Sequence, residues 1–482
     1  MYMRLPGGPI ALLIFSSAAF AQTTGTTGGG APFDNVQPSL AVTEVLLTSG
    51  IFPAHATDIP DASAVGGTMG FVYNFAGGFV PFATLSANGQ TLSIAQNTAL
   101  ASLLGVNTYS GGNGQTTFAL PNLVGTAAVG AGTGPGLSPW SVGQTGGSST
   151  TTLTTSQLPA HSHSLPGGGV TGVTGGTQPF SNVMPSLAVT PVIAVNPVQQ
   201  PNSAVFVGQV ANFAGTFVPA GWMAANGALL PIGPNLDLFN LIGTTYGGDG
   251  TTTFALPDLR GRVAIGASAN FQLGSTFGSE QTFLTVAQMP AHDHSLPGGG
   301  VTGNTGGNLP VSNYQPSLAL NYLIALDGIF PSRDGGANFS PSDAVIGQIV
   351  EFAGDVSRIP RGWALANGQL LSIAQNQELF SLIGTEYGGN GQTNFALPDF
   401  RGRTMIGSDY LLYALGDALG TESNVLTVAN LAPHDHSLLE TPPTNETPLP
   451  GALPLFATGL GALGLIGWRR KKKAAPIASK AV

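Results

Sequence analysis

The sequence contains no cysteine, so disulfide bonds cannot brace this protein. Charged residues make up only 8% of the chain, and every lysine lies at position 471 or beyond. Between the two ends, arginine is the only cationic residue and is outnumbered by acidic side chains. This argues against a nucleic acid or an anionic membrane as a partner, because binding phosphates requires a basic face.

Glycine and proline are abundant instead, at 70 and 36 residues. This balance is typical of turn-rich β proteins and unlike that of helical enzymes. The length of 482 residues accommodates roughly two to four domains of ordinary size. Stability must then come from hydrophobic cores, from assembly or from a bound metal.

Both ends of the chain have the composition of targeting segments. Residues 1–21 combine one early cation, an apolar run and a final Ala-x-Ala, which is typical of a cleavable secretory signal. An apolar N-terminal strand is the alternative. Residues 448–482 contain an uncharged apolar stretch followed by a run of arginine and lysine, which predicts a membrane-spanning segment with a cytoplasmic flank.

The C-terminal stretch PLPGALPLFATGLGALGLIGWRRKKKA also resembles the sorting signals of the PEP-CTERM type. In that family a membrane protease cuts near the motif and releases or transfers the protein to the outer surface of a Gram-negative bacterium. The resemblance implies a sorting protease as partner and a location at the cell surface, the outer envelope or the extracellular matrix. A plain transmembrane anchor is the alternative.

One unit of sequence occurs three times, which is the strongest sign of organisation. The units open with PSLAVTEVLLTSGIFP at Pro38, PSLAVTPVIAV at Pro185 and PSLALNYLIALDGIFP at Pro316. Each then contains Ala-Asn-Gly, which predicts a tight turn between strands. In the third unit, Ser372 and Gln375 predict a capping box that starts a short helix, and Gly384 ends it. We expect a β-rich α+β fold.

These units predict a tandem domain organisation. The expected segments are a degenerate first repeat at 32–165, a second repeat at 179–296, a third repeat at 310–437 and a linker at 438–447. PGGGVTGVTGG (166–176) and PGGGVTGNTGG (297–307) have no apolar face, so we expect flexible linkers there. The first repeat is degenerate because Thr84 or a neighbour stands where the other two have Trp222 and Trp363, and because it lacks their DLRGR or DFRGR motif.

The elements FAG, PRGWALANGQ, LFSLIGTEYGGNG, FALPDFRGR and PHDHS together resemble the phage tail collar domain, in the form found in microcystin-dependent proteins. The resemblance covers nearly all of residues 32–437. Phage short tail fibres with a related domain are trimers that bind a cell-surface receptor, and His-x-His from three chains holds one metal ion. Carried over to this chain, the implied ligands of zinc or another transition metal are His161, His163, His292, His294, His434 and His436.

The residues themselves leave several arrangements open. Residues i and i+2 of a strand point to one face, about 6.5 Å apart, so the imidazoles of one His-x-His can converge on one ion. Two ligands do not complete a site, and help from another copy is needed. The alternatives are an internal pseudo-trimer around one ion, a homotrimer of chains with three stacked sites, and a solvated strand end without metal.

The arginine motifs of the second and third repeats suggest structural ion pairs. Asp258 with Arg262, and Asp399 with Arg403, have a spacing of four residues across a predicted turn. Such pairs stabilise modestly when exposed. Ligand binding by these arginines is the alternative.

We expect no enzymatic activity. The residue between the histidines is Ser162, Asp293 or Asp435, so no invariant acid or nucleophile accompanies the pairs. A metal hydrolase with an open coordination position is the enzymatic alternative. The sequence predicts an exported structural or adhesion protein that binds a surface or matrix partner and associates with itself. A component of a phage-derived tail or injection particle is the alternative function.

Overall fold

The computed structural model describes residues 22–56, 67–196, 204–331, 343–409 and 411–438. The predicted signal at 1–21, the predicted sorting segment at 448–482 and all but the first residue of the predicted linker lie outside these ranges. Within the described ranges, no helix has the length and hydropathy needed to cross a membrane. Residues 23–437 form one compact unit.

Each repeat contributes a nine-residue strand, several shorter strands and one α-helix of two turns. The first repeat comprises β1 (Phe33–Asp34), β2 (Ser39–Leu47), β3 (Val72–Phe75), β4 (Thr84–Ser86), β5 (Thr91–Ser93), α1 (Thr98–Leu104), β6 (Thr117–Ala119), β7 (Ala127–Gly130), β8 (Thr145–Gly146), β9 (Thr150–Thr151) and the 3₁₀ turn η1 (Thr155–Gln157). The second comprises β10 (Phe180–Ser181), β11 (Ser186–Ala194), β12 (Gln209–Phe213), β13 (Trp222–Ala224), β14 (Leu229–Pro231), η2 (Gly233–Asn235), α2 (Leu236–Ile242), β15 (Thr253–Ala255), β16 (Val263–Gly266), β17 (Thr276–Phe277), β18 (Gln281–Thr282) and η3 (Val286–Gln288). The third comprises β19 (Val311–Ser312), β20 (Ser317–Ala325), β21 (Gln348–Phe352), η4 (Val356–Arg358), β22 (Trp363–Leu365), β23 (Leu370–Ser372), η5 (Ile373–Gln375), α3 (Gln377–Ile383), β24 (Asn394–Ala396), β25 (Thr404–Gly407), β26 (Ala418–Leu419), β27 (Ser423–Asn424) and η6 (Val428–Asn430).

The three long strands join the repeats into a closed ring. The second half of β2 pairs with β3 and β4 of its own repeat, while the first half pairs in parallel with β25 of the third repeat. In the same way β11 pairs with β7 of the first repeat, and β20 with β16 of the second. All nine residues of β2 and of β20 are buried, as expected for strands covered on both faces, and most of them are apolar.

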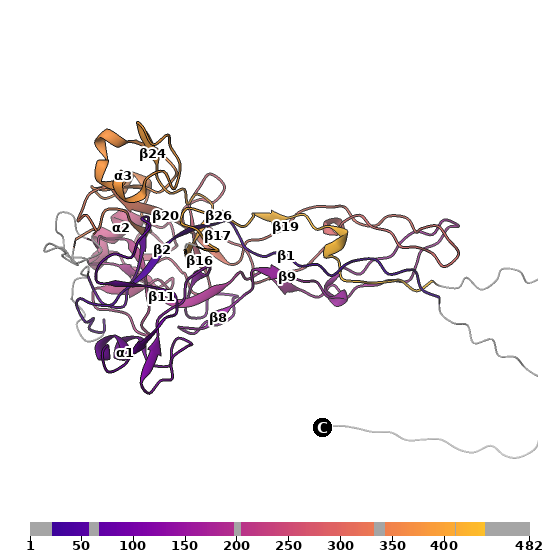
Figure 1. The fold of residues 1–482 in the computed structure, drawn as a ribbon, viewed down its shortest axis with the longest axis horizontal. Helices are drawn as coiled ribbons and strands as arrows, with labels where there is room; N and C mark the ends of the chain where they lie inside the picture. Colours follow the sequence, from indigo (N-terminus) through magenta and orange to yellow (C-terminus); the bar gives the residue numbers. More distant parts are fainter. Residues whose placement is uncertain (1–21, 57–66, 197–203, 332–342, 410, 439–482) are drawn as a thin grey trace, which may run out of the picture. The chain divides into compact units, whose positions relative to one another are not determined.

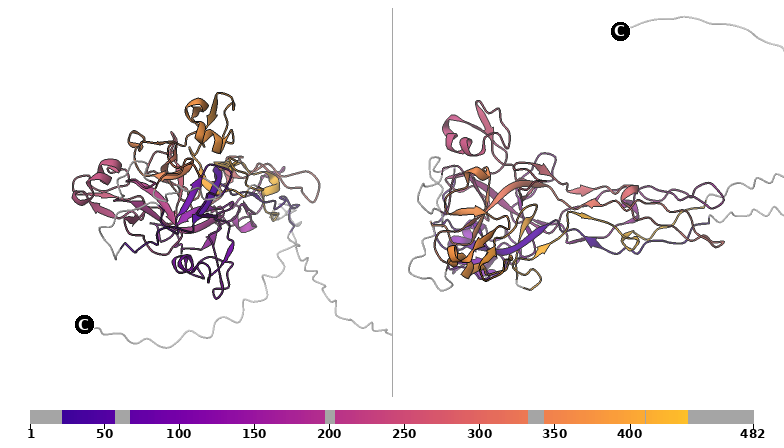
Figure 2. Two further views of the ribbon diagram at one scale, coloured as in Figure 1. Left: turned by 60° about the vertical axis from the view of Figure 1, so that its left-hand side comes forward. Right: turned by 90° about the horizontal axis from the view of Figure 1, so that it is seen from above.

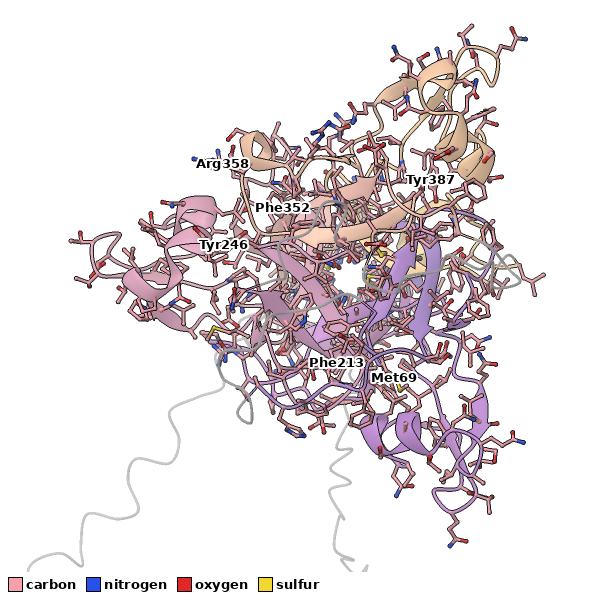
Figure 3. The ribbon with its side chains drawn as sticks, turned by 90° about the vertical axis from the view of Figure 1, so that its left-hand side faces the viewer. Met69, Phe213, Tyr246, Phe352, Arg358 and Tyr387 are labelled. Carbon is pink, nitrogen blue, oxygen red and sulfur yellow. The ribbon has the colours of Figure 1, made fainter. Side chains whose placement is uncertain are left out.

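Hydrogen bonds from three tyrosines follow the same cyclic order. The hydroxyl of Tyr109 donates to the carbonyl oxygen of Ala214 in the second repeat, at 2.6 Å. Tyr246 and Tyr387 each make the corresponding bond to the next repeat, at 2.8 and 2.9 Å. Figure 3 shows the three repeats spread as lobes around a common centre, with Tyr246 and Tyr387 on two of them. The predicted β-rich class is confirmed, and the repeats share cores.

The helix of the third repeat begins later than the sequence predicts. Ser372 caps only the 3₁₀ turn η5 and makes no side-chain capping bond, while α3 begins after Asn376. The side chain of Asn376 instead donates to the carbonyl oxygen of Ser372, at 3.0 Å. The predicted capping box is therefore wrong, because the chain inserts a 3₁₀ turn first. Gly384 does end the helix, at a φ of 53° that glycine adopts without strain.

A narrow part of residues 23–437, here called the shaft, is built from residues 23–36, 148–184, 279–314 and 421–437. Three antiparallel pairs form it, namely β1 with β9, β10 with β18 and β19 with β27. Figures 1 and 2 show these pairs running side by side away from the lobes. All three repeats contribute to one apolar core inside the shaft, made of Leu153, Leu158, Phe180, Leu284, Met289, Val311, Leu426, Leu431 and Ala432.

Candidate metal centre

The three His-x-His segments lie together in the shaft, each in an extended segment that pairs with a glycine- and threonine-rich segment. His161 is bridged to Thr174, and His292 to Thr305. His434 is bridged to Thr27, from the beginning of the described chain. The result is three hairpin-like pairs, which we call histidine hairpins 1 (159–176), 2 (290–307) and 3 (432–437 with 23–30).

The predicted flexible linkers at 166–176 and 297–307 are therefore wrong. They turn back at glycines, as at Gly168 and Gly169, which have positive φ, and then form the return strands of hairpins 1 and 2. Backbone bonds hold them, such as His161 N to Thr174 O at 2.9 Å and Thr171 N to His163 O at 2.9 Å. Apolar patterning could not predict this, because hydrogen bonds rather than a buried apolar face hold these segments.

The six imidazoles form two stacked triangles. The first histidines of the pairs have ring centroids 5.1 to 5.2 Å apart, and the second histidines 4.7 to 4.8 Å apart. Each first histidine also lies 4.8 Å from a second histidine of another repeat. The structure thus brings all six candidate ligands together within one chain: His161, His163, His292, His294, His434 and His436.

Every Nδ1 atom faces a backbone carbonyl oxygen. In the first triangle, Nδ1 of His161 lies 2.9 Å from the oxygen of Pro159, and the other two copies repeat this contact. In the second triangle the acceptor belongs to the neighbouring hairpin, as for His163 with Gly303 at 2.8 Å. Because a carbonyl oxygen only accepts, Nδ1 carries the proton and Nε2 presents a lone pair.

All six Nε2 lone pairs are consequently available inside the shaft. Nε2 of His163, His294 and His436 is buried without a hydrogen-bond partner. Nε2 of His292 lies 3.2 Å from Nε2 of both His161 and His434, where facing lone pairs repel unless a cation lies between them. The candidate ligand atoms of five of the histidines lie within 4.8 Å of one another. This buried cluster could hold a metal ion.

Burial favours the neutral form of five of the six histidines. Desolvation lowers the pKa of His161 from 6.5 to about 3, and those of His163 and His294 to about 4. Burial lowers the pKa of His292 and His434 as well. Neutral imidazole is the form that ligates metals, so the site is prepared for a cation at neutral pH.

A threonine-glycine motif that the sequence analysis did not single out supports the histidines. It reads TGTTG at 24–28, TGVTG at 171–175 and TGNTG at 302–306. In hairpin 1, the Thr171 hydroxyl accepts from the backbone N–H of His163 at 3.0 Å, and the Thr174 hydroxyl donates to the carbonyl oxygen of Asp435 at 2.6 Å. The feature of the sequence that could have identified this motif is its recurrence in three copies.

The predicted ion pairs of the arginine motifs exist, but each aspartate has a nearer partner. Arg262 lies 3.8 Å from Asp258, whereas Arg260 makes two bonds to the same carboxylate at 2.9 Å. In the third repeat, Asp399 likewise lies 3.7 Å from Arg403 and makes two shorter bonds to Arg401. The arginine two residues on is the nearer partner because its Nε and Nη2 groups both donate to the carboxylate. These pairs lie in the lobed part of the molecule.

Comparison with curated proteins finds no match, and comparison with solved structures likewise finds none. The scan against protein families does find one. Residues 70–128, 208–264 and 347–405 each match the family described as Phage Tail Collar Domain. Each match lies within one repeat, includes the strand β3, β12 or β21, and ends within β7, β16 or β25. Three matches in tandem, one per repeat of the ring, show that a part of each repeat is similar to this family.

Proposed function

We propose that this chain is an exported adhesion protein in which one polypeptide builds the threefold assembly that tail fibres build from three chains. The cyclic strand pairing supports this, since β2, β11 and β20 each complete a sheet of another repeat. The ring closes within one chain, so no further copy is needed to pair these strands. Self-association is thereby internal, and the lobes remain available to a surface or matrix partner.

A metal ion bound by the six histidines stabilises this assembly, and we call this role of the ion the metal lock. The observation that carries the proposal is the convergence of six imidazoles whose Nδ1 atoms are all held by carbonyl oxygens. Two triangles of nitrogen ligands suit a six-coordinate transition metal better than the tetrahedral preference of structural zinc. Since the ligands come from all three repeats, a bound ion would tie the repeats together and leave no coordination position for catalysis.

The composition of the lobes indicates which partners they suit. Residues 229–257 and 370–398 contain acidic residues but no lysine or arginine, and residues 91–121 contain no charged residue. The two acidic segments repel polyanions, and all three segments contain amide and hydroxyl groups for hydrogen bonds. The partner we propose is therefore an uncharged or cationic component of a cell surface or matrix, and a sorting protease acts at the C-terminal segment.

Elemental analysis together with native mass measurement tests the metal lock. We expect one transition-metal ion per monomeric chain and none in the His292→Ala/His294→Ala variant. A homotrimer with three stacked sites would retain two of its three ions in that variant. If the protein purified at neutral pH binds no added Co²⁺ or Zn²⁺, the metal lock is wrong.

Locating the protein in the native cell tests the proposed export independently of the metal lock. We expect the protein in the envelope or extracellular fraction, and we expect a variant lacking residues 448–482 to change its location. Recovery of a soluble cytoplasmic chain with both Met1 and Val482 present would contradict export.

A further inference from the structure

Hairpin 3 differs from the other two in how the chain forms it. In hairpins 1 and 2, the return strand follows the histidine segment after a turn at 165–169 or 296–300. In hairpin 3, the return strand is residues 23–30, while the histidines lie at 434 and 436. Its two strands come from opposite ends of the compact unit, so this hairpin forms only when the first segment docks on the last.

The docked segment contacts both hairpins 2 and 3. Thr24 exchanges two bonds with His436: its N–H donates to the carbonyl oxygen at 2.9 Å, and its hydroxyl accepts from the His436 N–H at 3.0 Å. The carbonyl oxygen of Gly25 accepts from Nδ1 of His294 at 2.8 Å. The hydroxyl of Thr27 donates to the carbonyl oxygen of Asp293 at 2.7 Å. This segment therefore orients the imidazole of His294 and fixes the backbone of His436.

We propose that residues 24–28 are a docking clasp whose positioning residues complete the metal centre, so that full metal affinity requires the N-terminal segment to occupy hairpin 3. This inference rests on the proposed metal lock. The clasp binds two parts of the same chain. One is the histidine segment 432–437 of hairpin 3, and the other is His294 of hairpin 2, whose Nδ1 faces the carbonyl oxygen of Gly25. Without the clasp, Nδ1 of His294 loses its acceptor, and His436 loses the strand that fixes its backbone.

The two continuous hairpins provide matched controls inside the same molecule. Gly172 and Gly303 repeat the role of Gly25, since their carbonyl oxygens accept from His436 and His163 at 2.8 Å. A Cβ atom at Gly25 would collide with the hydroxyl oxygen of Ser295, at Gly172 with that of Ser437, and at Gly303 with that of Ser164. An alanine at each glycine therefore forces the opposing serine hydroxyl out of its place between two hairpins, and replacing that serine by alanine should relieve the collision.

The first experiment titrates Co²⁺ into full-length variants and follows its visible spectrum. We expect Gly25→Ala to weaken Co²⁺ binding at least about tenfold, the range of changes around a metal ligand, and to convert the six-coordinate spectrum to one of lower coordination. Gly25→Ala/Ser295→Ala should restore both. Gly172→Ala and Gly303→Ala should weaken Co²⁺ binding in the same way. Adding Ser437→Ala to the first variant and Ser164→Ala to the second should restore it. Gly167→Ala, where a Cβ meets no atom within 4 Å, is the neutral control.

The second experiment supplies the clasp in trans. A variant lacking residues 23–28 should bind Co²⁺ weakly, and a synthetic peptide of residues 22–31 should restore the wild-type spectrum, whereas the same peptide with Gly25→Ala should not. Deletion without effect on Co²⁺ affinity or spectrum would overturn the clasp while leaving the metal lock intact. So would a Gly25→Ala variant that matches wild type while Gly172→Ala and Gly303→Ala are impaired. Failure of the wild-type protein to bind Co²⁺ would instead overturn the metal lock and the clasp with it.

Discussion

Nδ1 of His294 lies 2.8 Å from the carbonyl oxygen of Gly25, although the two residues are 269 positions apart in the sequence. The same contact links His163 to Gly303 and His436 to Gly172. Each hairpin therefore orients a histidine of its neighbour, in an order that closes on itself. The candidate ligands therefore depend on the architecture of the shaft, because the backbone of one hairpin fixes the histidine tautomer in the next.

Metal binding should raise the melting temperature of the protein. A metal present at 100 times its Kd stabilises the folded state by about 2.7 kcal/mol if it does not bind the unfolded chain. Differential scanning calorimetry with Co²⁺ and with a chelator measures the shift. His436→Ala should abolish most of it. His55→Ala is the matched control, because His55 stacks on Phe217 at 3.8 Å and should leave the shift unchanged.

The metal-free protein should lose stability as the pH falls. The pKa of His161 is about 3 and those of His163 and His294 about 4 in the folded state, below the ordinary 6.5, chiefly because burial disfavours the charged form. Between these values the unfolded chain binds more protons, so the free energy of unfolding decreases as the pH falls from about 6.5 toward 4. Denaturant unfolding with chelator present measures this slope. His161→Gln/His163→Gln should flatten it, and an unchanged slope would contradict the assignment.

A buried carboxyl group in β21, that of Glu351, should make the stability of the protein depend on pH in the opposite direction. Burial raises the pKa of Glu351 from 4.5 to about 7. Between about pH 4.5 and 7 the folded state then binds more protons than the unfolded chain, so the free energy of unfolding falls as the pH rises through this range. Glu351→Gln should therefore stabilise the protein by about 1–3 kcal/mol at pH 8 and have little effect at pH 5. Glu378→Gln, at an exposed position of α3, should do neither. Destabilisation by Glu351→Gln at pH 8 would show that a charged Glu351 is needed.

Local chemistry made part of this molecule predictable. The Asn-Gly turns appear with Gly89, Gly227 and Gly368 at positive φ, because no other residue adopts that conformation as easily. Gly384 ends its helix for the same reason. The recurrence of His-x-His pointed to the residues that converge in the shaft.

The long-range pairing could not be predicted in the same way. Ser39 is paired with Thr404, and an apolar strand does not specify which distant edge will cover it. The return strands of the histidine hairpins read as linkers, since their stability comes from backbone and hydroxyl bonds that leave no hydrophobic pattern. In the arginine motif, the spacing of four residues suggested Arg262 as the partner of Asp258, although the turn brings Arg260 closer.

Truncation of Trp222 should destabilise the whole ring rather than one repeat. Trp222 is 3% exposed and its ring centroid lies 4.8 Å from that of Phe71 in the first repeat. It belongs to a core that includes residues of the first two repeats. Trp222→Ala should cost about 3–5 kcal/mol, as for other buried aromatics, and because the core is shared, unfolding should remain a single transition. Hydrogen exchange should accelerate in β3 of the first repeat as well as in β13.

Thr84 provides the matched control for this variant, because it occupies the position of Trp222 in the first repeat. Thr84 is paired with Leu47, as Trp222 is with Ala194, but its side chain is only half-buried. Thr84→Ala should therefore change stability by about 0.5 kcal/mol or less. A Trp222→Ala protein that unfolds in two steps, with protection in β3 unchanged, would show that the repeats fold independently. The cyclic pairing predicts the reverse, since no repeat completes its sheet alone.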